Sequence, residues 1–370
     1  MPNIRVLVVD DSVVVRRLVG DVLAADPDID LVGTAANGRL ALSKVEQLRP
    51  DIVTMDIEMP ELDGVQTVRQ LRRSGNRVPV IIFSTMTDRG ATATLDALAA
   101  GATDYVTKPA NVGSVGRSME QVRSSLIPKI KGLAGRPSAP ASTPAPAQPP
   151  ATAPAPVLRP VRTGPAKGRT RGYDVLVVGC STGGPEALTT FLSSLPRLSV
   201  PVAVVQHMPA VFTRQFATRL DRSLPYDVAE ATPGQLLRPG TVTIAPGDHH
   251  LHLTATAAGL VVRLSQEPPE NFCRPAVDVL FRSAAQASKG RVLGVVLTGM
   301  GQDGCRGASA VVDAGGSVLV QDRATSVVWG MPGAVAGAGL AEEVLPLAEL
   351  GPAVGKRLAQ LPGLTGAATR

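Results

Sequence analysis

The chain has 370 residues, of which 44% are hydrophobic and 3% aromatic, and its formal net charge is +6. This length favours two domains over one, and aliphatic packing is typical of α/β folds. No apolar run approaches the roughly 20 residues that cross a bilayer, and the first strand-like run starts without a cleavable leader. We therefore expect a cytoplasmic protein that is not an integral membrane protein. Three cysteines without C-x-x-C spacing indicate neither a disulfide framework nor a zinc site.

Strand-like and helix-like segments alternate through about the first 130 residues. The strand-like runs are 4–9, 31–36, 51–55, 78–83 and 103–107, and helix-like stretches start near Val13, Arg39, Val65, Ala91 and Val115. Five βα repeats predict an α/β fold with a doubly wound, flavodoxin-like parallel sheet. Ligands of such sheets bind at the carboxyl ends of the strands.

Polar residues follow four of these strands. They are Asp10 and Asp11, Asp56, Ser84 and Lys108. Carboxylates gathered in one pocket repel each other unless a hard cation such as Mg²⁺ lies among them, and a lysine and a hydroxyl could bind a transferred phosphoryl group. Singly, each has an ordinary explanation: Asp11 caps the helix before Val13, Ser84 ends a strand, and Lys108 lies in a loop. Their order at successive strand ends favours a functional pocket.

In motif order and spacing, residues 3–127 resemble the response-regulator receiver domain. The resemblance implies that Asp56 is the phosphorylated aspartate, with a histidine kinase as phosphodonor. It also implies that Asp11 ligates Mg²⁺ with Asp10, Asp56 and the backbone carbonyl of Glu58.

The same resemblance assigns the parts of a switch. Lys108 would contact the phosphoryl group, and Tyr105 would be the aromatic side chain that reorients. The sequence FSTM offers both Ser84 and Thr85 as the switch hydroxyl. We prefer Ser84, the first hydroxyl after the strand.

A Pro/Ala-rich segment separates the two halves of the chain. Its composition cannot bury a core and favours extended conformations, so we predict a flexible, disordered linker over 131–172. Between Gly132 and Gly172 it holds six positive charges and no acidic residue: Arg136, Arg159, Arg162, Lys167, Arg169 and Arg171. The rest of the chain is therefore neutral overall, which argues against a nucleic-acid partner.

The second half opens with an apolar strand, 173–179, and a glycine-rich turn. Gly179, Ser181 and Gly183 fit the G-x-S-x-G spacing that leaves a serine hydroxyl exposed between a strand and a helix. Alternatively, Ser181 caps a helix whose first turn contains Pro185. The choice between nucleophile and cap depends on a partner base.

His207 is the best candidate for that base. It follows the apolar run 201–206 and lies 26 residues after Ser181, about one βα unit, so neighbouring strands could bring the two together. The alternative is an ordinary loop histidine. His249, His250 and His252 could suggest a metal, but no cysteine or acidic cluster with ligand spacing lies near them, and solvated strand ends often carry such residues.

An acid must orient the base. Asp303 and Asp322 follow strand-like runs, whereas Asp278 lies inside a helix-like stretch and is the weaker candidate. We prefer Asp303 because its turn, TGMGQDG, could also direct backbone N–H groups at a developing oxyanion. Its alternative role is to cap the helix-like stretch 305–313.

The order Ser, His, Asp differs from the Ser, acid, His order of α/β-hydrolases. The set GCSTGG, VVQHMP, IAPGDHH, RPAVDVLF, LTGMGQDG and VVWGMP instead resembles the chemotaxis protein-glutamate methylesterases, the CheB family, across 173–362. The resemblance implies Ser181 as nucleophile, His207 as base and Asp303 as orienting acid, with Thr182 and the Met300 backbone N–H near the oxyanion.

Two positions depart from the family pattern. Cys180 stands where alanine is common, and Gln302 where asparagine is common. Neither change removes a member of the triad. We expect Cys180 to be a small buried filler rather than a thiol nucleophile, because the residue before the turn should point back into the sheet.

The resemblance implies a phosphorylation-activated esterase for chemosensory adaptation. It would hydrolyse glutamate γ-methyl esters of methyl-accepting chemoreceptors and deamidate certain glutamines, without a cofactor for the esterase step. The receiver would cover the cleft until Asp56 is phosphorylated. We expect a receiver at 1–130, a catalytic α/β domain at 173–362 and a tail at 363–370; recruitment to membrane receptor arrays stays open. The alternatives are a DNA-binding or a noncatalytic output domain.

Overall fold

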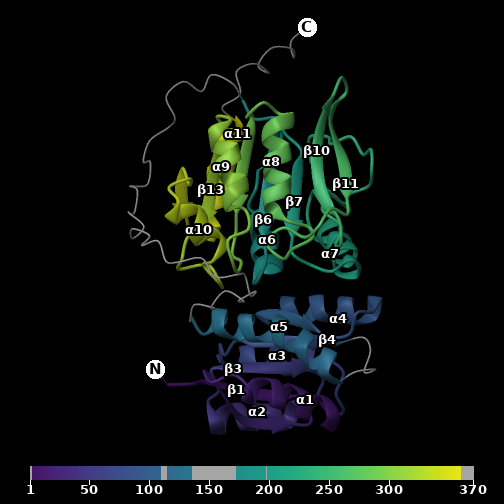
Figure 1. Cartoon of the computed structure of the whole chain (residues 1–370), viewed down its shortest axis with the longest axis vertical. Helices are drawn as coiled ribbons and strands as arrows, with labels where there is room; N and C mark the ends of the chain where they lie inside the picture. The colour runs from purple at the N-terminus through teal and green to yellow at the C-terminus, as the bar shows by residue number, and fades with distance from the viewer. Residues whose placement is uncertain (1, 110–114, 136–171, 197, 360–370) are drawn as a thin grey trace, which may run out of the picture.

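The computed structural model describes residues 2–109, 115–135, 172–196 and 198–359, which form two units with one parallel sheet each (Figure 1). Of the predicted linker, residues 136–171 lie outside the described part of the chain, and so does the predicted tail. None of the described helices is long and apolar enough to cross a membrane.

The first unit is a five-stranded parallel sheet in the order β2-β1-β3-β4-β5. Its elements are β1 (Ile4–Val9), α1 (Val13–Ala24), β2 (Ile29–Ala35), α2 (Gly38–Leu48), β3 (Ile52–Asp56), α3 (Gly64–Arg73), β4 (Val80–Ser84), α4 (Asp88–Ala99), β5 (Asp104–Thr107) and α5 (Val115–Leu133). The predicted doubly wound sheet is confirmed.

Alternate strand side chains of this sheet belong to two apolar cores. One core contains side chains of α1 and α5, and the other contains side chains of α2, α3 and α4. The strands therefore read as continuous apolar runs, as expected where helices cover both faces. The chain leaves β1 toward β2 on one side, whereas β3 lies on its other side. This reversal opens a crevice at the carboxyl ends of β1 and β3.

The second unit is a seven-stranded parallel sheet in the order β14-β13-β12-β6-β7-β9-β8, with an antiparallel hairpin of β10 and β11 beside it. Its elements are β6 (Val175–Cys180), α6 (Gly184–Ser193), β7 (Val202–Gln206), α7 (Ala210–Ser223), β8 (Asp227–Glu230), β9 (Thr241–Ile244), β10 (His250–Thr256), β11 (Gly259–Ser265), α8 (Val277–Ala287), β12 (Val292–Val296), α9 (Cys305–Asp313), β13 (Ser317–Gln321), α10 (Met331–Gly337), β14 (Glu343–Leu345) and α11 (Leu347–Ala359).

This sheet is also covered on both faces. One core contains α6, α7 and α11, and the other contains α8, α9, α10 and the hairpin. The predicted second α/β domain is confirmed. Here the strand order reverses between β6 and β12, so the residues after these two strands meet at the same edge.

The two units pack directly against each other. Helix α4 of the first unit contacts α6 and α7 of the second, and Figure 1 shows α4 and α5 lying beneath the lower end of the second sheet. Tyr105 stacks on Phe212 of α7, with ring centroids 4.7 Å apart and planes 9° from parallel. One apolar core thus runs without a break from the first unit into the second.

Candidate functional site

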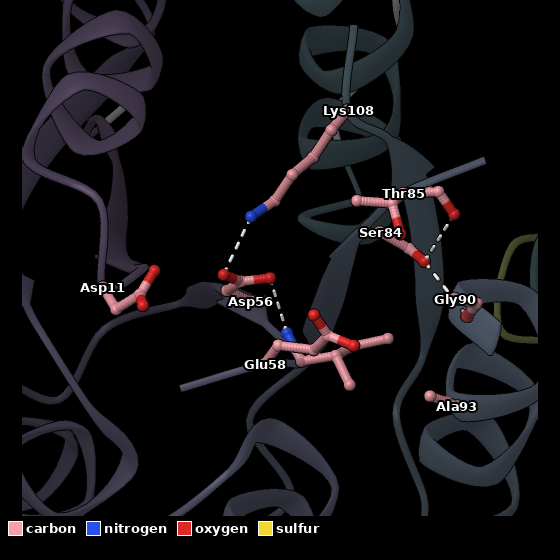
Figure 2. A pocket seen from close by; sticks show the side chains of 9 residues that line it. Asp11, Asp56, Glu58, Ser84, Thr85, Gly90, Ala93 and Lys108 are labelled. Atoms are coloured by element: carbon pink, nitrogen blue, oxygen red, sulfur yellow. Dashed lines mark hydrogen bonds and ion pairs between the residues drawn. The ribbon is translucent and has the colours of Figure 1, made fainter. Parts of the chain in front are cut away.

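The first sheet gathers the predicted acidic pocket at its reversal point. Ligand oxygens of Asp10, Asp11 and Asp56 lie within 4.8 Å of one another. Figure 2 shows the Lys108 side chain extending toward Asp56, with Asp11 to the left of Asp56. Lys108 Nζ lies 2.8 Å from Asp56 Oδ2 and 3.0 Å from Asp10 Oδ2. Glu58, Ser84 and Thr85 help to line a cavity of about 290 Å³. The four strand ends therefore converge as predicted.

Burial sets the electrostatics of this pocket. It raises the pKa of Asp56 to about 6, with Asp10 adding to the rise and Lys108 opposing it. Burial would lower the pKa of Lys108, but the two facing carboxylates raise it above the ordinary lysine value. The pocket thus holds more negative than positive charge, which favours an additional cation.

The donor atoms fit Mg²⁺. Asp10 Oδ2 is buried and pairs with Lys108 Nζ outside hydrogen-bond geometry, and the three carboxylates supply the hard oxygen ligands that Mg²⁺ prefers. Asp11 remains exposed and does not cap α1, contrary to the ordinary explanation. Ser12 caps that helix instead by accepting from the Val15 N–H.

The two candidate switch hydroxyls differ in their surroundings. Ser84 is buried, donates to the Gly90 carbonyl at 3.2 Å and accepts from Thr94 Oγ1 at 2.6 Å. Thr85 is exposed and its hydroxyl contacts Thr87. Ser84 therefore connects β4 to the start of α4, the helix that contacts the second unit.

The turn after β6 presents Ser181 in the way that the glycine spacing predicts. The N-cap of α6 is Gly183, with φ of +72°, and no side chain caps this helix. Ser181 is therefore not the cap. A side chain on Gly179 would collide with Val277, and one on Gly299 would lie 2.9 Å from the Ser181 Cβ, so glycine lets neighbouring elements approach the serine closely.

Strand register brings the candidate base to the serine. Cys180 pairs with Gln206 between β6 and β7, so the next residues, Ser181 and His207, leave neighbouring strands at the same level. The His207 N–H donates to the Cys180 carbonyl at 3.1 Å. Gln206 Nε2 donates to the Ser181 carbonyl at 3.0 Å, which ties the two turns together.

Asp303 meets the histidine from the loop after β12. Its Oδ2 lies 2.8 Å from His207 Nε2, and both side chains are nearly buried. The carboxylate also accepts the backbone N–H groups of Val277, at 2.7 Å, and Asp278, at 3.0 Å. Asp303 thus caps α8 rather than α9, which corrects the alternative role expected for it.

The other two candidate acids, Asp278 and Asp322, form different contacts. Asp278 Oδ1 accepts the Gly307 N–H at 2.6 Å, so this acid supports the first turn of α9. Asp322 accepts from the backbone and hydroxyl of Thr325 in a local turn. Asp303 alone among the three candidate acids contacts His207 in the described part of the chain.

The pKa values of the pair shift in opposite directions. Burial by itself would raise the pKa of Asp303, but His207 and the α8 N–H groups lower it below the ordinary value. Burial would lower the pKa of the His207 imidazolium, whereas the neighbouring Cys273 sulfur and Asp303 raise it above 6.5. An ionised Asp303 therefore stabilises a protonated His207.

A cysteine that the sequence reasoning missed contacts the other ring nitrogen. Cys273 Sγ lies 3.5 Å from His207 Nδ1. Within the described residues, no hydrogen bond involves the Ser181 hydroxyl. Serine and histidine are therefore adjacent but not hydrogen-bonded in this conformation. The sequence contained no motif for Cys273, which lies 66 residues after His207 and reaches it only through folding.

The predicted auxiliary residues face the first unit. No hydrogen bond in the described ranges uses the backbone N–H of Thr182 or Met300, so both remain available to an oxyanion. The Thr182 hydroxyl donates to Asp104 Oδ2 at 2.7 Å, and Lys129 binds the same oxygen at 2.6 Å. Gly132 of α5 adjoins the Met300 side chain. The first unit therefore contacts residues directly beside Ser181.

The remaining candidates have structural roles. Cys180 is fully buried, and burial raises the pKa of its thiol, so it is an inert filler. His250 bonds the Pro268 carbonyl and the Ala276 N–H, and His252 bonds Ser265. In the described residues these histidines belong to no cluster that could hold a metal.

Comparisons with known proteins match both halves of the chain to known families. A CheB methylesterase family model matches residues 176–354, and a response regulator receiver domain model matches 6–117. The chain is 67% identical to a protein-glutamate methylesterase/protein-glutamine glutaminase of Nocardioides sp., and 99% of each chain is covered. The chain belongs to the CheB methylesterase family. The resemblance seen in the sequence is thus confirmed, and a noncatalytic or DNA-binding output is not favoured.

Two further relatives share less of their sequence with this chain. A protein of Trichodesmium erythraeum with the same name is 45% identical, with 97% of this chain and 100% of its own length covered. The crystal structure of the Thermotoga maritima CheB methylesterase catalytic domain is 41% identical, has a TM-score of 0.49, and covers 50% of this chain and 98% of that chain.

Proposed function

We propose that this protein hydrolyses glutamate γ-methyl esters of chemoreceptors with Ser181, His207 and Asp303, and that phosphorylation of Asp56 relieves a block by the receiver. The observation that carries the proposal is the contact between His207 and Asp303, with His207 following the strand next to the one that Ser181 follows, at the same level of the second sheet. The curated relatives are named for this ester hydrolysis and for glutamine deamidation. We assign residues 1–130 to the receiver and 173–362 to the esterase.

The ring contacts support one assignment of the base nitrogen of His207. Nε2 faces the Asp303 carboxylate, so we assign the shared proton to Nε2 and the lone pair that accepts the serine proton to Nδ1. Cys273 lies against Nδ1 in the receiver-docked form. The Ser181 hydroxyl must therefore reach Nδ1 in place of the Cys273 sulfur before it attacks.

The reaction then follows acyl transfer. Ser181 Oγ bonds to the γ-carbonyl carbon while its proton passes to His207 Nδ1, and the free N–H groups of Thr182 and Met300 bind the oxyanion. The bond to the methoxy oxygen breaks as His207 returns the proton, which releases methanol. Water, deprotonated by His207, hydrolyses the acyl-enzyme to glutamate and free Ser181. With a glutamine substrate the leaving group is ammonia.

In the receiver, Asp56 accepts a phosphoryl group from a histidine kinase. The residues that would hold Mg²⁺ are Asp10, Asp11 and Asp56, with the Glu58 carbonyl, and the ion would neutralise charge on the phosphoryl oxygens. Lys108 already contacts Asp56 and can bind one of these oxygens.

The proposed switch passes from this pocket to the domain contact. We prefer Ser84 as the switch hydroxyl because it connects β4 to α4, with Thr85 as the alternative. Tyr105, the proposed aromatic switch, stacks on Phe212 of the esterase. A shift of Ser84 toward the phosphoryl group would thus disturb α4 and β5, which hold the receiver over Thr182.

The test is methanol release from a methylated receptor fragment. Replacing Ser181 by alanine should reduce the rate by about 10⁴-fold or more, because no other group forms the acyl-enzyme. Acetyl phosphate with Mg²⁺ should raise the wild-type rate, and Asp56→Asn should remove that rise without lowering the basal rate. Unchanged methanol release by Ser181→Ala would refute the proposed triad.

A further inference from the structure

A strained turn lies beside the proposed triad. Glu270 and Cys273 pair across it, with the Glu270 N–H donating to the Cys273 carbonyl at 3.1 Å and the reverse bond at 2.9 Å. The two residues between them, Asn271 and Phe272, have φ of +52° and +62°. Two positive φ values in a two-residue hairpin loop are typical of a type I′ turn, for which Asn-Gly is preferred. Phenylalanine therefore stands where glycine is the favoured residue.

The side chain of Phe272 is also unfavourably exposed. It is 96% exposed, the highest value among the large apolar side chains of the described residues. Its ring gains nothing from burial and its backbone is strained, so this residue adds nothing to the stability of the fold. Strained positions of this kind concentrate at functional sites because the surrounding structure holds them in place.

Strong contacts hold this turn in position. Asn271 Nδ2 donates to Asp278 Oδ2 and to Asp303 Oδ1, both at 2.9 Å. Glu270 forms two bonds with Arg282, at 2.7 and 2.6 Å. Paired charge-assisted bonds of this type are both strong and directional. The backbone that carries Phe272 is thus rigid.

The neighbours of Phe272 place its ring at the rim of the catalytic centre. The preceding residue, Asn271, contacts Asp303, and the following residue, Cys273, contacts His207. The phenyl ring remains exposed while the receiver is docked over Thr182. A protein substrate whose glutamyl ester reaches His207 therefore lies close to the turn that carries this ring.

We propose that Phe272 is a specificity-determining residue that docks the substrate protein by packing against an apolar side chain next to the methylated glutamate. This inference rests on the proposed esterase function. Rigid aromatic side chains dominate the energetics of many protein interfaces because they bury a large area at a low entropy cost. Phe272 discriminates in this way between an ester carried by a protein and a small free ester.

The turn geometry allows a substitution that removes the ring without straining the backbone. Phe272→Gly should preserve the fold and raise or maintain Tm, because glycine suits a positive φ. For a methylated receptor fragment, we expect KM to rise about 10-fold with kcat nearly unchanged, as for loss of an interface anchor. Hydrolysis of N-acetylglutamate γ-methyl ester should stay at the wild-type rate. Phe272→Leu, which keeps an apolar side chain, should recover most of the affinity.

Two kinetic outcomes would overturn the inference. One is an unchanged KM of Phe272→Gly for the receptor fragment. The other is an equal loss of activity on the small ester, which would show that the turn merely positions His207 and Asp303. A lower order of association of the Phe272→Gly full chain in sedimentation would also overturn it, by assigning the ring to a contact between two copies of the protein.

A binding measurement separates this inference from the proposed triad. In the Ser181→Ala background, the full chain should bind the methylated fragment about 10-fold more weakly when Phe272→Gly is added. This result is expected even if Ser181→Ala retains methanol release, in which case only the triad assignment fails. Equal binding by the two proteins would reject the docking role.

Discussion

The two units both place acidic residues at the reversal point of a parallel sheet, but the contacts made by these carboxylates differ. In the receiver, Asp10 Oδ2 and Asp56 Oδ2 both pair with Lys108 Nζ, at 3.0 and 2.8 Å, and the contact of Asp10 Oδ2 lies outside hydrogen-bond geometry. In the esterase, Asp303 accepts from Asn271 and from the backbone N–H groups at the start of α8. The receiver carboxylates thus keep oxygen atoms that can still bind a cation, whereas the oxygen atoms of Asp303 already accept hydrogen bonds.

The pKa shifts follow this difference. Burial raises the pKa of Asp56 to about 6, and the adjacent Asp10 adds to the rise. The pKa of Asp303 is lowered despite burial, because His207 and backbone N–H groups stabilise its charge. The carboxylate that must take a phosphoryl group thus has few hydrogen bonds that stabilise its charge. The carboxylate that must orient a base is instead held ionised in a single position.

Among the substitutions that test this comparison, the largest effect is expected where the orienting acid loses its charge. Asp303→Asn should lower the methanol-release rate about 10²- to 10⁴-fold, because a neutral amide neither fixes the His207 tautomer nor stabilises the imidazolium. The measurement is kcat on a methylated receptor fragment, with thermal unfolding to follow the lost α8 cap. Asp322→Asn is the control, since Asp322 is another candidate acid that follows a strand, accepts from Thr325 in a local turn and does not contact His207. Equal losses in both variants would contradict the assignment of the acid.

A smaller effect is expected at the contact between the two units. Asp104→Asn should weaken the bond to Thr182 by about 0.5–1.5 kcal/mol, since a charge-assisted bond becomes a neutral one. The receiver should then release more readily, and methanol release without phosphodonor should rise roughly 2- to 10-fold.

The control for this prediction is an exposed contact of the same interface. Asp96 and Arg219 form an ion pair with side chains 47% and 39% exposed, and exposed pairs contribute little. Asp96→Asn should therefore change the basal rate by less than about 2-fold. A basal rate that is insensitive to Asp104→Asn would mean that the Thr182 contact does not hold the receiver closed.

The smallest effect is a pH shift. His207 must be neutral to accept the serine proton, so activity falls as pH drops through its pKa. Cys273 raises that pKa, and Cys273→Ala should therefore lower it and move the acid limb of the kcat/KM profile to lower pH. The profile should be recorded on a small ester without phosphodonor, in the receiver-docked form in which the thiol contacts Nδ1. A limb that stays in place or moves to higher pH would exclude electrostatic coupling between the thiol and the imidazole.

Local sequence patterns by themselves determined the two sheets and the candidate residues. Long apolar runs such as 175–180 require a buried strand wherever they occur, and residues just after such runs lie at one edge of a parallel sheet. This was sufficient to predict both sheets and to select Ser181, His207, Asp303 and Asp56 as candidates. The short strands β8, β9 and β14 were not predicted, because three or four residues carry too little periodicity, and the hairpin strand β11 was not predicted either.

Tertiary structure alone decided how those candidates are connected. It assigned Asp303 to the cap of α8 instead of α9, brought Cys273 to His207, and placed Asp104 against Thr182 across the two units. None of these contacts has a sequence signature, because each joins residues far apart in the chain through a single side chain. Strand and helix patterns repeat over neighbouring residues and can be read directly from the chain, whereas a unique long-range contact exists only once the packed layers bring its two ends together.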